Sequence, residues 1–100
     1  MSKGERRTSK AAMKRLLKSK FFNEVIEIVK ALDYYLTTDE RDLAKEMMDK
    51  WFVAKKALEF ITGNVYVFSR DSTTFSIVNE RNHDDRLFVG LSIVPEVKAS

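Results

Sequence analysis

Apolar side chains recur every three or four residues through the first third of the chain, which is the period of one face of an α-helix. The stripe consists of Met13, Leu17, Phe21, Val25, Val29, Leu32 and Leu36. It is widened by Leu16, Phe22, Ile26, Ile28 and Tyr35. Because such a broad stripe is typical of a helix with a large buried face, the pattern predicts one long helix over 9–36.

A second helix is predicted to begin in the segment Thr37-Thr38-Asp39-Glu40. Thr37 and Glu40 have the spacing of a capping box, in which each side chain bonds a backbone N–H of the other residue. Apolar residues then recur at helical spacing up to Gly63, which can adopt the left-handed conformation that ends a helix. Because only a short turn separates the two helices, we expect an antiparallel hairpin.

The period changes to two after Gly63, which indicates β-strands. Three apolar runs, at 65–68, 75–78 and 87–93, are separated by the short polar segments 70–73 and 81–85. Connections of this length suit β-hairpins. The sequence therefore predicts an α+β fold, in which an N-terminal antiparallel helical hairpin is followed by a three-stranded antiparallel β-meander (α-α-β-β-β).

The alternation along these runs divides the strand residues between two faces of the sheet. One expected face carries Val65, Val67, Ile77, Leu87, Val89, Leu91 and Ile93, and the other carries Tyr66, Phe68, Val78, Phe88 and Val94. Two helices can cover only one face of such a sheet. We therefore expect Tyr66, Phe68 and Phe88 to be left open and to bind a protein partner, or a second copy in a homodimer.

Composition fits one compact domain, since the chain has 100 residues of which 44% are hydrophobic. Residues 1–8 lack apolar side chains after Met1, so we expect a disordered basic arm there and a single α+β domain over 9–100. The absence of cysteine excludes disulfides and cysteine-ligated metals. Neither a bilayer-spanning apolar run nor a secretory signal pattern is present, so we expect a cytoplasmic protein.

Positive charge is concentrated at the start of the chain. The first twenty residues hold eight basic side chains and one acid, Glu5, and so carry +7, whereas the whole chain carries +3. This polarity suggests an anionic partner. Lys10, Lys14 and Lys18 recur every four residues and would form a stripe along a helix that can follow a phosphate backbone. The expected nucleic-acid-binding residues are Arg6, Arg7, Lys10, Lys14, Arg15 and Lys18.

The segment 80–86 is the one place where acid, base and cation side chains gather. Glu80 and His83 could transfer protons and Arg81 could stabilise a phosphoryl transition state, as in a small metal-independent ribonuclease. A polar turn between strands has the same composition, however, because turns favour Asn, Asp and His. We therefore expect no enzyme activity, no catalytic residues, no metal site and no cofactor.

These features favour a small nonenzymatic binding or regulatory protein that contacts nucleic acid or a nucleoprotein through its basic N-terminal arm and helix. One alternative is a protein-interaction or inhibitor module that uses an apolar sheet face. The ribonuclease described above is a more distant alternative.

Overall fold

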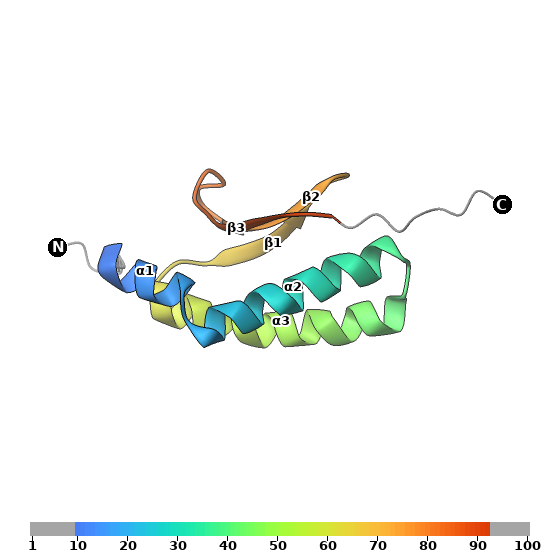
Figure 1. The fold of residues 1–100 in the computed structure, drawn as a ribbon, viewed down its shortest axis with the longest axis horizontal. Helices are drawn as coiled ribbons and strands as arrows, with labels where there is room; N and C mark the ends of the chain where they lie inside the picture. Colours follow the sequence, from blue (N-terminus) through green and yellow to red (C-terminus); the bar gives the residue numbers. More distant parts are fainter. Residues whose placement is uncertain (1–9, 93–100) are drawn as a thin grey trace.

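The computed structural model describes residues 10–92 of the chain. Three helices precede three strands: α1 (Lys10–Leu17), α2 (Lys20–Thr37), α3 (Arg41–Thr62), β1 (Tyr66–Arg70), β2 (Thr74–Asn79) and β3 (Arg86–Leu91). Helices α2 and α3 form an antiparallel hairpin on one side of an antiparallel sheet of order β1-β2-β3 (Figure 1). The predicted α+β architecture is confirmed. The basic arm expected at 1–8 lies outside the described residues.

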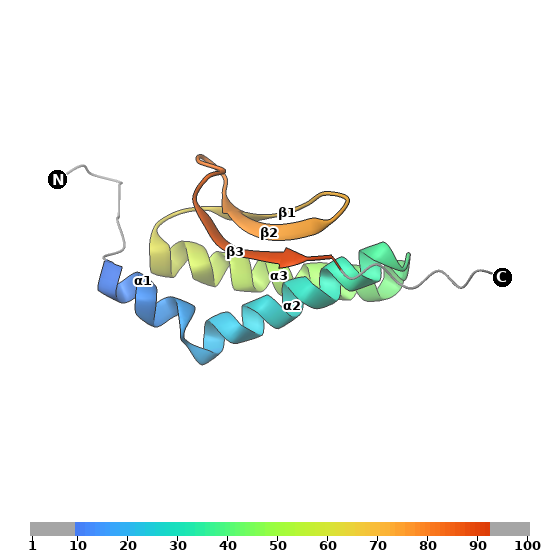
Figure 2. The same ribbon diagram turned by 45° about the horizontal axis from the view of Figure 1, so that its top comes forward.

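The prediction of one long first helix is wrong, because the chain bends between α1 and α2 (Figure 2). Ser19 is the N-cap of α2, and its Oγ accepts a hydrogen bond from the Phe22 backbone N–H at 3.0 Å. The same Oγ donates to the Leu16 carbonyl of α1 at 2.6 Å. A serine hydroxyl that bonds nearby backbone groups in this way competes with continued helix, which is why serine favours N-caps.

The turn between α2 and α3 also differs from the expected capping box. Thr37 is the last residue of α2, and its Oγ1 donates to the Asp33 carbonyl at 2.8 Å. Glu40 is the N-cap of α3 and makes no side-chain capping bond. The turn instead uses Asp39 with φ of 59°, a left-handed conformation that aspartate tolerates better than most residues. The predicted end of α3 is confirmed, since Gly63 has φ of 75°.

The core lies between the helical hairpin and the sheet, and the predicted assignment of sheet faces is wrong. Tyr66 and Ile77 are fully buried and belong to the same core cluster as Val29, Leu32 and Trp51 of the helices. The pairing of Phe68 with Ile77, and of Ile77 with Phe88, places these side chains on one face. The expected open surface at Tyr66, Phe68 and Phe88 is therefore the face turned toward the helices.

Aromatic packing explains why this face is the buried one, since aromatic side chains bury the most apolar area. The ring of Phe75 lies 6.3 Å from that of Phe68 and 5.8 Å from that of Phe88. Gly90 pairs with Phe75 in the neighbouring strand, and a Cβ at position 90 would lie 2.6 Å from Cζ of that ring. Any larger residue at position 90 would therefore have to displace the Phe75 ring from the aromatic layer.

A buried carboxylate connects the hairpin to the sheet. Asp33 of α2 is 1% exposed, and its Oδ1 accepts a hydrogen bond from Nε of Arg70 at 3.0 Å and from Oγ of Ser92 at 3.1 Å. Nη2 of Arg70 also donates to Oγ1 of Thr37 at 2.9 Å. Since Arg70 ends β1 and Ser92 follows β3, one side chain holds both outer strands to α2.

No helix within 10–92 combines the length and the apolar character that crossing a bilayer requires.

We predict that Arg70→Met lowers the free energy of unfolding by about 2–3 kcal/mol, because it leaves the Asp33 carboxylate buried without its cation. The loss in the free energy of unfolding for the double variant Asp33→Leu/Arg70→Met should be smaller than the summed losses of the two single variants, by about 1 kcal/mol or more. Urea unfolding of the four proteins measures this coupling. Arg41→Met is the matched control, because the ion pair of Arg41 with Asp39 is largely exposed to solvent and its loss should change the free energy of unfolding little. Additive effects would contradict the prediction.

Candidate nucleic-acid interface

Helix α1 turns its basic side chains to solvent. Lys10, Lys14, Arg15 and Lys18 are exposed in and directly after α1, whereas Leu16 is only 6% exposed and belongs to the core cluster. Alanine, leucine and lysine are strong helix formers, which explains a helix at this composition. The helix is therefore anchored by an apolar side chain on one side and presents cations on the other.

The basic residues of α1 lack nearby acidic partners within the described part of the chain. The ion pairs there join Lys30 to Glu27, Arg41 to Asp39, Lys55 to Glu59 and Arg70 to Asp33. None of these involves a residue of 10–20, and that segment contains no acid of its own. The positive charge of α1 is thus uncompensated by described carboxylates and can attract an external anion.

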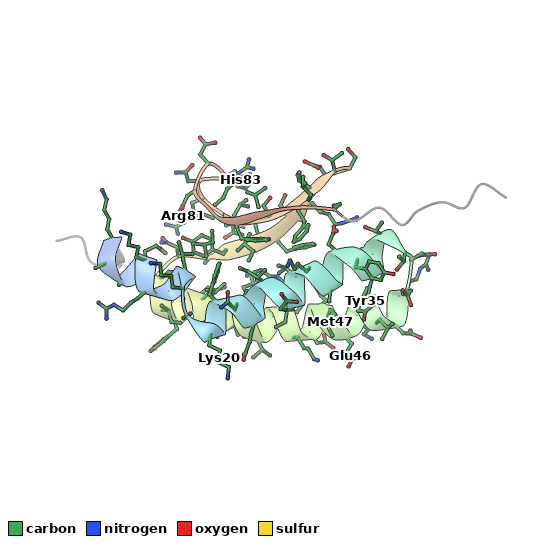
Figure 3. The ribbon with its side chains drawn as sticks, viewed as in Figure 1. Lys20, Tyr35, Glu46, Met47, Arg81 and His83 are labelled. Carbon is green, nitrogen blue, oxygen red and sulfur yellow. The ribbon has the colours of Figure 1, made fainter. Side chains whose placement is uncertain are left out.

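The structure brings together four of the six predicted nucleic-acid-binding residues, namely Lys10, Lys14, Arg15 and Lys18. Arg6 and Arg7 lie outside the described residues. The sequence prediction left out Lys20, which is exposed at the start of α2 and points away from the sheet (Figure 3). Lys20 belongs to the same N-terminal basic block, and this was the signal in the sequence that could have added it to the predicted binding residues.

Arg81 and His83 lie in the loop between β2 and β3, at the same end of the molecule as α1 (Figures 1 and 3). Both are exposed, as is Glu80. Around them the loop is held by its own polar groups: Oδ1 of Asn79 accepts from the Arg81 backbone N–H at 2.9 Å, and Nδ2 of Asn79 donates to Oδ2 of Asp85 at 3.0 Å. Asn79 and Asp85 therefore have a structural role in this turn.

Tyr66 reaches the same turn from the core. Its ring is fully buried, and its hydroxyl donates to Oδ2 of Asp85 at 3.3 Å. Burial disfavours the phenolate, and the negative charge of Asp85 together with its hydrogen bond disfavours it further, so the pKa of Tyr66 is raised from 10.0 to about 12. The neutral phenol is the form that the folded protein holds.

We predict that the free energy of unfolding falls as the pH rises from 10 to about 12, because the unfolded chain loses the Tyr66 proton before the folded protein does. Below pH 10 this contribution is fully present. Tyr66→Phe is the control, since it retains the other groups that titrate in this range and lacks this one. If unfolding of the two proteins depended equally on pH, the raised pKa would be contradicted. The difference between their tyrosinate absorbances at each pH measures the ionisation of Tyr66 directly.

No cluster of three or more histidine, aspartate or glutamate side chains that could hold a metal ion occurs among the residues that the structure describes. Comparison with known proteins found no matching family model, no matching curated protein and no matching solved structure.

Proposed function

We propose that this protein is a nonenzymatic binding protein that contacts the phosphate backbone of a nucleic acid, bare or within a nucleoprotein, through α1 and the basic residues around it. The observation that carries the proposal is the set of exposed cations on α1 without acidic partners among the described residues. Binding of such a segment to phosphates releases condensed counterions, which supplies a favourable, salt-dependent free energy.

The spacing of the cations also suits a polyanion. Lys10, Lys14 and Lys18 are four residues apart, which corresponds to about 6 Å along a helix axis. This is close to twice the roughly 3.4 Å axial separation of phosphates on one strand of B-DNA. Contacts to phosphates carry no sequence information. We therefore expect binding that depends weakly on base sequence and strongly on ionic strength.

The test compares two triple variants with the same change in net charge. Lys10→Ala/Lys14→Ala/Lys18→Ala should weaken binding to labelled DNA and RNA duplexes and lower the slope of log K against log salt concentration by about one unit for each lost phosphate contact. The measurement is fluorescence anisotropy at several salt concentrations.

The control variant removes three exposed lysines from other surfaces, Lys30, Lys45 and Lys56. It should bind with nearly the slope of the wild type, because its lysines belong to α2 and α3 and not to the basic stripe of α1. Equal loss in both variants would mean that net charge alone drives binding. Absence of binding by the wild type at low salt would exclude the proposed function.

A second candidate function, a protein-interaction module, is favoured by the outer face of the sheet. Val89 is 49% exposed and Leu91 is 77% exposed, both on the edge strand β3. This face replaces the aromatic one expected from the sequence. We predict that Leu91→Asp abolishes capture of a protein partner from nuclease-treated cell extract while leaving nucleic-acid affinity unchanged. A partner retained equally by the wild type and the variant would exclude this face as its docking site.

A further inference from the structure

The helical hairpin has a second side, which the sheet does not cover. Between α2 and α3 the described residues form a groove whose apolar lining is Phe21, Val25, Ile28, Val53 and Ala54, with Glu24 and Lys50 beside them. Lys20 and Glu46 lie one helical turn beyond these two charged residues and point away from the sheet (Figure 3). The groove therefore runs along the side of the hairpin opposite the sheet.

Several apolar side chains along this side of the hairpin are exposed to solvent and are not buried in the core. Val53 is 72% exposed and Ile61 is 46% exposed, and Leu43 at the other end of α3 is 39% exposed. A second hollow, lined by Ala12, Leu16, Phe21 and Ile61 with Arg15 and Ser19, continues the apolar surface toward α1. Contiguous apolar surface of this kind is typical of an interaction site.

The charges along the groove are arranged with alternating sign. Lys20 and Glu24 are four residues apart on α2, and Glu46 and Lys50 are four residues apart on α3. Because the two helices are antiparallel, the order from the α1 end toward the α2–α3 turn is Lys20, Glu24, Lys50, Glu46. Reversal of this series exchanges each lysine with a glutamate, so the groove is complementary in charge to a reversed copy of itself.

We propose that the partner of this groove is a second copy of the chain, packed hairpin to hairpin about a twofold axis. In this arrangement Lys20 of each protomer faces Glu46 of the other, and Glu24 faces Lys50. Ile28 and Val53, which lie between the charged pairs, pack near the axis. The dimer then has four helices at its centre, in two stacked pairs, with one sheet on each outer side. Both protomers use the same surface patch, as a twofold dimer requires.

The dimensions of the hairpin suit such an interface. Helices of 18 and 22 residues are about 27–33 Å long, and two adjacent helices are about 20 Å wide. The exposed face of the hairpin thus has a projected area of about 600 Å². Because side chains protrude from this face, its accessible surface area is larger and approaches the roughly 800 Å² that each partner buries in a standard interface. Lys10, Lys14 and Lys18, the lysines that test nucleic-acid binding, line neither hollow, so substitutions there probe a different surface from the one tested here.

The experiment uses charge reversal at positions that are distant within one protomer. In a dimer of the Lys20→Glu variant, two repulsive Glu–Glu contacts replace the two contacts between Lys20 and Glu46. In a dimer of the Glu46→Lys variant, two repulsive Lys–Lys contacts replace them. Each variant should dimerise about tenfold more weakly than the wild type in sedimentation velocity. An equimolar mixture of the two variants should recover dimerisation, since the mixed dimer restores attraction at both contacts.

Lys56→Glu is the matched control, because Lys56 is exposed on α3 and belongs to neither hollow. It should dimerise like the wild type. Val53→Asp should weaken dimerisation while circular dichroism and urea unfolding show a folded protein, since this side chain is largely exposed. A wild type that stays monomeric up to about 1 mM, or a mixture of Lys20→Glu and Glu46→Lys that associates no better than either alone, would overturn the proposal.

Discussion

The attachment of the sheet to the helices depends on the buried carboxylate of Asp33. Apolar contact alone would leave the sheet free to shift over the hairpin, because hydrophobic burial has no direction. The carboxylate removes that freedom, since a buried charge is costly unless specific donors reach it. Its donors are Arg70 and Ser92, at the ends of the two outer strands. In the observed placement of the sheet both donors reach Oδ1, and Tyr66 and Phe75 lie in the core.

Polar side chains hold the two hairpin turns of the sheet as well. Oδ1 of Asp71 accepts hydrogen bonds from the backbone N–H groups of Thr73 and Thr74 at 2.9 and 2.8 Å. These bonds stabilise the carboxylate and lower the pKa of Asp71, and the bond from Thr73 has the larger effect. In the other turn, Asp85 accepts from Tyr66 and Asn79. Asp71 and Asp85 thus have local partners, whereas the cations of α1 lack ion-pair partners among the described residues.

Sequence periodicity was sufficient to predict the hairpin, the three strands and the basic residues of α1, because each of these depends on spacing within one segment. It could not reveal the bend at Ser19, since the apolar stripe continues through both helices and both contribute to the same core. Nor could it orient the sheet. Alternation shows which residues of one strand share a face, but the irregular pairing between Ile77 and Val78 changes the alignment of β3 and depends on tertiary contacts. The unpaired state of the α1 cations likewise depends on where the acids lie in space.

The order of the elements along the chain has a consequence for how the protein folds. Within 10–92, the elements whose backbones approach most closely are consecutive in sequence, from α1 with α2 to β2 with β3. Each such contact closes only a short loop, so little chain entropy is lost at each step, and topologies of this kind fold rapidly. The hydrogen bonds of Asp33 to Arg70 and to Ser92 span 37 and 59 residues and are among the contacts that depart from this pattern. The hairpin can therefore form while the strands are still being synthesised, and the bond to Ser92 completes the fold.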